Sequence, residues 1–275
     1  MTGVQTCALP IYLQEKKTKF KLNPRINENP YLDNQLKQLE MQFLATKKRL
    51  ENKFGAKKFI VYFQSFTNTY APFPTLKALY EKALSFENVI GLSIGTRTDC
   101  VTDEILDYLV NLSKDKEIWI EYGIQSFFDE TLVRVNRGDD SSNMKYWIKK
   151  SKEKGLNVCG HLIYGLPGEN QEMMLETFRQ TIELNVDSIK FHPLYVVKNT
   201  LLTNEYKKGK FTPISEELYI DTVVKSIINL PLNVSVQRIT AGIDDDTLLS
   251  PLWCRDKHTQ MKNIRLALEK VGFNY

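Results

Sequence analysis

The feature that most constrains the fold is a regular alternation of short apolar runs with helical patterns. The runs are rich in β-branched and aromatic residues, and they are FIVYF (59–63), VIGLSI (89–94), EIWIEY (117–122), LNVCGHLIY (156–164) and DSIKFHPLYVV (187–197). Amphipathic helical patterns lie between them, and another spans 33–54, where Gly55 is placed to end it. The step from run to run is about 30 residues, the size of a βα unit. Apolar strands that alternate with helices predict a parallel sheet covered by helices.

Polar residues stand within or just after each predicted strand, toward its carboxyl end. They are Gln64, Thr96, Arg97, Asp99, Gln125, Ser126, His161 and His192. In a barrel the carboxyl ends of all strands meet at one mouth, where active sites lie. An open doubly wound sheet is the alternative, but it binds ligands mainly at one switch point. Since five consecutive strands bring polar groups, the pattern favours a barrel.

The composition is ordinary for a soluble globular protein, with 42% hydrophobic and 25% charged residues. No apolar run approaches the roughly 20 residues needed to cross a bilayer, so we expect a chain that does not span a membrane and has no membrane partner. The net charge of +4 permits an anionic partner such as RNA without arguing for one. The four cysteines, at 7, 100, 159 and 254, form no CxxC pair, and we expect them to be buried free thiols of a cytoplasmic protein. Three histidines without a carboxylate at zinc spacing predict no metal site made of them.

Two stretches carry the most specific chemistry. In HLIYGLPGE (161–169), a strand leads into a turn whose two glycines would let the backbone approach a flat ligand closely, although an ordinary βα turn explains it equally well. In IEYGIQSFFDETLVRVNRGDD (120–140), Gly123 is expected to end the strand and Gln125 to stand at its mouth. The fork of donors on Arg137 suits a carboxylate, and a solvated arginine is the alternative.

A third stretch, SIGTRTDCVTDEIL (93–106), places Arg97 and Asp99 at a strand end, with Thr102 or Asp103 as the cap of the next helix. Together the motifs YFQSFT, GTRTDC, NRGDD, GLPGE, KFHPL and PLWC resemble the radical S-adenosylmethionine (radical SAM) superfamily. The resemblance is strongest to bacterial members of unassigned substrate, related to the elongator-type and coproporphyrinogen-oxidase-type cores. It implies a (β/α)6 TIM-type core over 33–198 and an α/β C-terminal extension over 199–275 packed on that core.

The resemblance also implies roles for particular residues toward S-adenosylmethionine. Ser65, Phe66 and Thr67 fall where such cores bind the methionine amino group. Gln125 and Arg137 match ligand contacts, and Arg137 would face the methionine carboxylate. The remaining implied binding residues are His161, where related cores hold Asp or His, and the strand end Ile163–Gly165, beside the adenine. No catalytic residue is implied.

Superfamily members cleave S-adenosylmethionine reductively to a 5′-deoxyadenosyl radical, using a [4Fe–4S] cluster held by a CxxxCxxC motif after the first strand. An external reductant such as flavodoxin or ferredoxin would supply the electron. This chain has no CxxxCxxC, and its residues 1–11 match the translation of a common sequencing-library adapter. We therefore expect an upstream first strand and cluster loop to be missing, 12–32 to be the remnant of that loop, and the chain as written to be inactive.

Two other functions remain open at the level of sequence. A barrel that lost its cluster in evolution could bind a nucleotide or RNA without catalysis. A conventional TIM-barrel aldolase or isomerase would need a buried lysine or paired carboxylates at the strand ends, and Lys190 is the only strand lysine near the predicted mouth.

Overall fold

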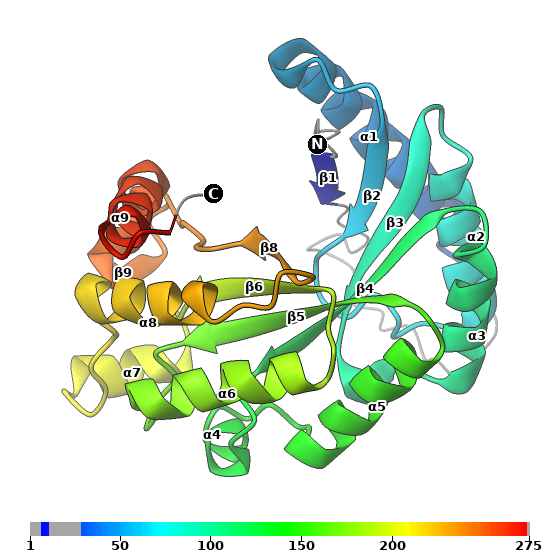
Figure 1. The fold of residues 1–275 in the computed structure, drawn as a ribbon. Coiled ribbons are helices and arrows are strands. Elements are labelled where there is room, and N and C mark those ends of the chain that lie inside the picture. The colour runs from blue at the N-terminus through cyan, green and yellow to red at the C-terminus, as the bar shows by residue number, and fades with distance from the viewer. Residues whose placement is uncertain (1–6, 11–28, 274–275) are drawn as a thin grey trace. The chain divides into compact units, whose positions relative to one another are not determined.

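The structure, a computed structural model, describes residues 7–10 and 29–273 (Figure 1). The chain divides into two compact units, Met1–Gly123 with Lys150–Val158, and Ile124–Lys149 with Cys159–Tyr275. Strand β4 (Glu117–Gln125) and helix α5 (Ser141–Glu153) each run from one unit into the other. Among the described residues, no helix has the length and apolar character that crossing a bilayer requires.

The first unit is a parallel sheet with alternating helices. After helix α1 (Leu32–Phe54), its elements are β2 (Phe59–Phe63), α2 (Phe73–Leu84), β3 (Val89–Thr96), a 3₁₀ turn (Thr98–Cys100), α3 (Asp103–Leu112) and β4. Strand β3 pairs in parallel with β2 on one side and with β4 on the other. All five residues of β2 are buried, as expected for a strand of a parallel sheet.

A short strand lies at the edge of this sheet. Strand β1 (Cys7–Pro10) has four residues and pairs in parallel with β2. It falls in the stretch 1–11, for which the sequence predicted no part in the fold, and it occupies the edge where the first strand was expected to be missing. The rest of the predicted adapter stretch and most of the predicted loop remnant 12–32 lie outside the described residues.

The second unit contains β6 (Ser188–Pro193), β8 (Ser235–Arg238) and all but the first two residues of β5 (Asn157–Tyr164), and β6 pairs in parallel with both of the others. A separate antiparallel pair joins β7 (Val196–Val197) to β9 (Leu248–Ser250). The helices of this unit are α4 (Asp129–Arg134), most of α5, α6 (Gln171–Glu183), α7 (Leu201–Lys207), α8 (Glu216–Ile228), the 3₁₀ helix Leu252–Arg255 and α9 (Lys257–Lys270).

Two strand boundaries differ from the prediction. Gly123 does not end its strand, because β4 continues to Gln125, whose φ of 68° turns the chain. The apolar run 187–197 is not one strand: β6 ends at Pro193, and β7 joins another sheet. After Pro193 the backbone N–H of Leu194 still donates to the carbonyl of Tyr164, at 3.0 Å, before the chain leaves β5.

One face of the second unit's sheet packs on α6 and α8, which lie along β5 and β6 (Figure 1). The ring of Phe191 lies 6.3 Å from that of Phe178 on α6, and the Tyr164 ring lies 6.2 Å from that of Tyr219 on α8. The hydroxyls of Tyr164 and Ser226 are 2.7 Å apart. Since side chains alternate along a strand, the neighbouring positions point to the opposite face. That opposite face carries the polar residues of the strands.

Candidate functional site

In the first unit, the loop after β2 is fastened to the strand ends by Asn68 and Thr69. The amide of Asn68 donates to the carbonyls of Phe63 and Gly95, both at 2.9 Å. The hydroxyl of Thr69 lies 2.5 Å from that of Thr96 and donates to the carbonyl of Cys100 at 2.7 Å. Both side chains are buried, so the loop between them and β2 is held at the carboxyl ends of β2 and β3.

This fastening positions the predicted binding residues Ser65 and Thr67, which are half-buried. Phe66 between them is 75% exposed and has a φ of 63°, a left-handed conformation that a bulky residue seldom adopts. The hydroxyls of Ser65 and Thr67 therefore lie at the strand ends, on a loop that the side chains of Asn68 and Thr69 hold in place.

The polar residues after β3 are largely engaged with one another. Arg97 donates to the carboxylate of Asp99 through Nε at 2.7 Å and Nη2 at 2.5 Å. Thr102, one of the two predicted caps, is the N-cap of α3 and accepts from the N–H of Ile105 at 3.3 Å. Arg97 and Asp99 therefore stabilise the turn after β3, and Thr102 stabilises the start of α3.

In the second unit, the turn after β4 is tied to the turn after β5. Gln125 ends β4 in a left-handed conformation, and the next residue, Ser126, is fully buried. The Ser126 hydroxyl donates to Oε1 of Glu169 and accepts from the N–H of Phe128 at 3.1 Å. The serine of the Gly-x-Gln-Ser stretch is thus joined to the glutamate of Gly-Leu-Pro-Gly-Glu. Sequence analysis predicted a site residue at Gln125 but missed Glu169, because nothing in the local pattern marks its partner.

Burial raises the pKa of Glu169 above its usual range, and hydrogen bonds from Ser126 and Thr131 oppose that shift. Its second oxygen, Oε2, is buried and has no hydrogen-bond partner among the described residues. A buried acceptor without a donor disfavours the ionised form. The carboxyl group therefore keeps its proton to a higher pH in the folded chain than in the unfolded chain.

This shift predicts a pH dependence of stability. Between the unfolded pKa of about 4.3 and the raised folded pKa, the folded state binds more protons, so the free energy of unfolding falls as the pH rises through that window. Glu169→Gln removes the titration and supplies an amide donor where Oε2 lies. We therefore expect the free energy of unfolding of this variant to fall less than that of the wild type as the pH rises from about 4 to 7, measured by urea denaturation. Glu217→Gln, at an exposed glutamate of α8, is the control and should follow the wild type. Parallel curves for Glu169→Gln and wild type would contradict the assignment.

The glycines of the turn after β5 have different structural reasons. Gly165 has a φ of 90°, and a Cβ there would lie 2.7 Å from the Cβ and Cγ2 atoms of Ile214. Gly168 has a φ of 91° and open space around it. The room beside Gly165 is therefore filled by Ile214 in this structure, and the predicted contact of Gly165 with a ligand stays a prediction.

The face of the second unit's sheet that points away from α6 and α8 is basic. Lys190 on β6 is in register with His161 on β5 and with Arg238 on β8, and His192 lies two residues further along β6. Nη1 of Arg238 lies 3.0 Å from Nε2 of His192, and the rings of His161 and His192 are 6.2 Å apart between centroids. Lys190 is only 4% exposed. We call these four residues, His161, Lys190, His192 and Arg238, the basic face.

The predicted binding residues are divided between the two units. Ser65 and Thr67 belong to the first unit, whereas Gln125, Arg137, His161, Ile163 and Gly165 belong to the second. Arg137 follows α4, is 7% exposed, and its backbone N–H donates to Leu132 at 2.9 Å. The structure brings His161 beside His192 and ties the Gln125 turn to the GLPGE turn. Their roles toward a ligand stay predictions.

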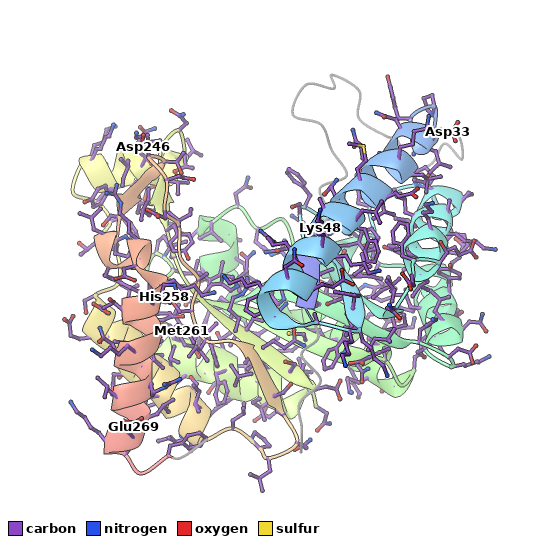
Figure 2. The ribbon with its side chains drawn as sticks, turned by 90° about the horizontal axis from the view of Figure 1, so that it is seen from above. Asp33, Lys48, Asp246, His258, Met261 and Glu269 are labelled. Carbon is purple, nitrogen blue, oxygen red and sulfur yellow. The ribbon has the colours of Figure 1, made fainter. Side chains whose placement is uncertain are left out.

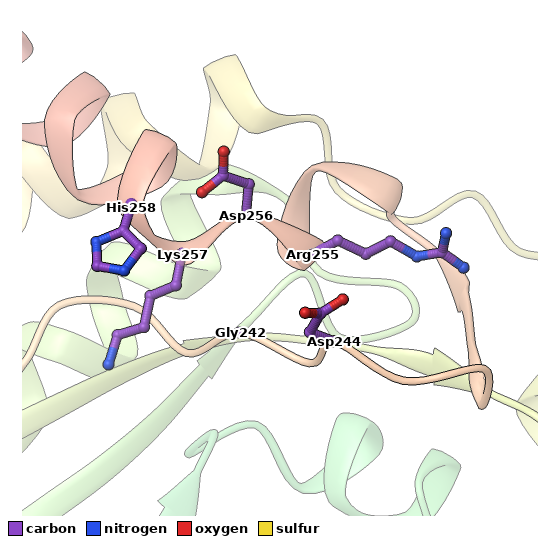
Figure 3. A pocket seen from close by; sticks show the side chains of 6 residues that line it. All are labelled: Gly242, Asp244, Arg255, Asp256, Lys257 and His258. Atoms are coloured by element: carbon purple, nitrogen blue, oxygen red, sulfur yellow. The ribbon is translucent and has the colours of Figure 1, made fainter.

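The C-terminal part of the second unit contains a pocket of about 530 Å³ at the start of α9 (Figure 3). Its lining residues are Gly242, Asp244, Arg255, Asp256, Lys257 and His258. Figure 2 shows His258, Met261 and Glu269 along α9. Asp256 caps this helix by accepting from the N–H of Thr259 at 3.0 Å and from its hydroxyl at 2.6 Å, and these bonds lower the pKa of Asp256. The pocket contains none of the predicted site residues.

The three cysteines whose side chains the structure describes, Cys100, Cys159 and Cys254, do not offer the ligands of an iron–sulfur cluster. Such clusters are held by several cysteine thiolates. Cys159 and Cys254 are buried, Cys100 is half-buried, and burial raises the pKa of the Cys254 thiol to about 12. A thiol so disfavoured as a thiolate is a poor metal ligand. The sequence also lacks a CxxxCxxC motif.

Comparison with known proteins gives matches over most of the chain. The family model described as the radical SAM superfamily matches residues 35–181, and the radical SAM C-terminal domain matches 186–270. Protein YhcC of Escherichia coli K12 is 39% identical over 83% of this chain and 74% of its own length. YtqA of Bacillus subtilis 168 is 34% identical over 88% of this chain and 75% of its own length.

Among solved structures, the archaeal Elp3 of Methanocaldococcus infernus with an N-terminal deletion has a TM-score of 0.72 and 22% identity. The match covers 86% of this chain and 60% of that one. At this identity the likeness shows the fold alone. It confirms the predicted fold class, an α/β fold of the partial TIM-barrel type.

Proposed function

Because the chain belongs to the radical SAM superfamily, we propose that it forms the S-adenosylmethionine-binding core of an enzyme whose full-length form cleaves that molecule reductively. The match of two family models along the chain is the observation that carries this proposal. When bound, S-adenosylmethionine supplies the radical chemistry. The conventional aldolase alternative has no comparable support.

The residues at the strand ends suit the two parts of this ligand. The guanidinium of Arg137 has five donors in a planar fork that matches a carboxylate, and Gln125 offers an amide donor and acceptor. Ile163 presents an apolar side chain suited to the adenine. We assign the hydroxyls of Ser65 and Thr67 to the methionine amino group, and His161 and Gly165 to further ligand contacts.

The cluster does not fit the cysteines described above, so no step through it is assigned to this chain. We propose that the [4Fe–4S] cluster is held by cysteines outside this sequence, with a flavodoxin or ferredoxin as electron donor. The 275 residues would then bind S-adenosylmethionine without cleaving it. The missing cluster motif also keeps a second candidate open, a non-catalytic barrel that binds a nucleotide or RNA and does not bind S-adenosylmethionine.

Replacing Arg137 tests the proposal directly. Truncating one partner of a buried charged pair costs about 2–5 kcal/mol in binding, and about 1.4 kcal/mol corresponds to tenfold. We therefore expect Arg137→Ala to weaken the binding of S-adenosylmethionine by at least about tenfold in isothermal titration calorimetry. Arg134→Ala is the matched control, because Arg134 lies three residues earlier in the chain, is exposed, and pairs with Glu205 on α7 at 2.9 Å.

Because Arg137 is buried, its removal could act through folding. Arg137→Lys keeps the charge but loses the fork of donors, and thermal unfolding of both variants separates a folding defect from a binding defect. Equal affinities of wild type and a folded Arg137→Ala would contradict the role of Arg137. No binding of S-adenosylmethionine by the wild type would favour the non-catalytic barrel.

A further inference from the structure

We infer that the loop after β2 (residues 64–72) forms a subsite for an uncharged planar ring of the substrate, which Phe66 and Tyr70 contact. We call these two residues the aromatic pair. The inference deepens the proposed function and rests on it only for the statement that the bound molecule is a substrate. The ring subsite itself is argued from the first unit alone, which contains both residues.

Phe66 has a backbone conformation that its own side chain disfavours. Its φ of 63° lies in the left-handed region, where a bulky residue is strained and glycine or asparagine is usual. Its ring is also 75% exposed, so burial within the described fold does not compensate for that strain. Residues in such conformations cluster at ligand sites, where the side chain acts outside the packing of the fold. A contact with another molecule therefore explains this residue better than the fold does.

Tyr70 carries the second exposed ring of the same loop, with 60% of its surface accessible. Its backbone N–H donates to the carbonyl of Thr67 at 3.1 Å, which closes a turn over residues 67–70. The Cα atoms at the two ends of such a turn lie less than about 7 Å apart. Since Phe66 directly precedes the turn, the side chains of the aromatic pair start from neighbouring points of the loop.

The backbone that carries the aromatic pair is fixed by buried hydrogen bonds. The hydroxyl of Tyr80 donates to the carbonyl of Asn68 at 2.6 Å, and the N–H of Asn68 donates to the carbonyl of Gly95 at 3.2 Å. These bonds add to those of the Asn68 and Thr69 side chains described above. A site whose backbone is already ordered loses little conformational entropy when a ligand binds. The loop therefore presents its two rings in a preorganised arrangement.

The surroundings of the aromatic pair favour an uncharged ring. The loop is tied to the turn after β3 through the bond from Thr69 to the carbonyl of Cys100. The charged residues of that turn, Arg97 and Asp99, pair with each other. Aromatic side chains stack on planar rings in an offset arrangement, and this stacking adds to the burial of apolar area. A saturated ring of the same size lacks that contribution, so the aromatic pair discriminates in favour of a planar one.

The exposed area of the aromatic pair suits a small molecule and not a protein partner. At 150–250 Å² for each aromatic side chain, the exposed fractions of 75% and 60% amount to roughly 200–350 Å². A stable protein interface buries about 800 Å² on each partner. The other exposed large apolar side chains in the described part of the first unit belong to helix α1 or its start, and they are Tyr31, Met41, Leu44 and Phe54.

Phenol and cyclohexanol test the subsite as matched probes, because they share a hydroxyl group and ring size and differ in planarity. Each is titrated separately into the full chain with ¹³C-labelled phenylalanine and tyrosine rings, and the ring resonances of Phe66 and Tyr70 are followed by NMR. We expect saturable shifts of both residues with phenol, at an affinity at least about fivefold higher than for cyclohexanol. Equal affinities for the two probes, or no saturable shift with either, would overturn the inference.

Phe66→Leu keeps an apolar side chain and removes the ring. The shift of Tyr70 then reports the affinity for phenol, which we expect to fall by at least about fivefold. Phe54→Leu, at an exposed aromatic residue of α1, is the matched control and should leave that affinity unchanged. If Phe66→Leu does not fold, Tyr70→Leu serves instead, with the shift of Phe66 as its readout. Unchanged phenol affinity in the folded variant would overturn the inference.

Glycine tests the strain at position 66. Phe66→Gly and Phe66→Ala both lack the ring, and glycine alone adopts a positive φ at no steric cost. We therefore expect Phe66→Gly to have the higher urea midpoint of the two. An equal or lower midpoint would show that this position is not strained and would overturn the inference.

Failure of this inference is distinguishable from failure of the proposed function. Calorimetry with S-adenosylmethionine reports the Arg137 site, and the phenol titration reports the aromatic pair. Phenol binding that persists at saturating S-adenosylmethionine would support a separate substrate subsite. Displacement of phenol by S-adenosylmethionine would show that the aromatic pair belongs to the site of that ligand and would overturn the substrate assignment.

Discussion

Gly91→Ala is expected to yield a chain whose first unit is largely unfolded or insoluble. A Cβ at this position would lie 1.9 Å from the carbonyl oxygen of Glu117 and 2.7 Å from its carbonyl carbon. Gly91 is the register partner of Glu117 on β4, and it follows an irregularity in the pairing of β3 with β2. A glycine within a strand often marks such a bulge or a close backbone approach. The carbonyl group of Glu117 cannot move away from the added methyl group without disturbing the backbone hydrogen bonds between β3 and β4.

Gly160→Ala is the matched control, since it adds the same methyl group inside a strand. There the new atom would lie 2.9 Å from Ile124 Cδ1 and from Thr181 Cγ2, which are ends of side chains that can shift. Overpacking of this kind typically costs about 1–3 kcal/mol. We expect Gly91→Ala to destabilise the fold by more than that range. Since the free energy of unfolding of a domain is typically only about 5–15 kcal/mol, such a loss would leave much of the unit unfolded. Circular dichroism and urea denaturation measure both variants. A urea midpoint of Gly91→Ala equal to or above that of Gly160→Ala would contradict the prediction.

Phe63→Ala is expected to cost about 3–5 kcal/mol of stability, the range for removing a large aromatic side chain from a core. Phe63 ends β2, is fully buried, and packs edge-on against Tyr80 with ring centroids 5.2 Å apart. Because its carbonyl also accepts from Asn68, the cavity opens beside the strand end that holds the Ser65–Thr67 loop.

Phe66→Ala, three residues further along, is the control for this change. That ring is 75% exposed, and the residue keeps its positive φ in either form, so we expect a change within about 0.5 kcal/mol. The urea midpoints of the two variants should therefore differ widely. Similar midpoints would show that the β2 end is not packed as described.

The sequence by itself predicted the features that depend on neighbours along the chain. The run 59–63 is a strand, as its buried aliphatic and aromatic residues indicated, and the pattern over 33–54 is helix α1, which begins one residue earlier. Gly55 ends that helix in the left-handed conformation that a C-terminal glycine supplies. Thr102 caps α3 through a bond to a residue three positions away. Each of these depends on periodicity or on local hydrogen bonding, which a single sequence displays.

Only the tertiary structure decided which distant residues meet. Ser126 and Glu169 are 43 positions apart, and His192 and Arg238 are 46 positions apart. No local pattern marks such pairs, because they arise from the register of parallel strands and from turns that meet at strand ends. The same reason explains why Gln125 rather than Gly123 ends β4, and why 187–197 divides between two sheets. The periodicity of the sequence determined the strands and helices, and the pairing of the strands decided the charge and hydrogen bonding of the basic face.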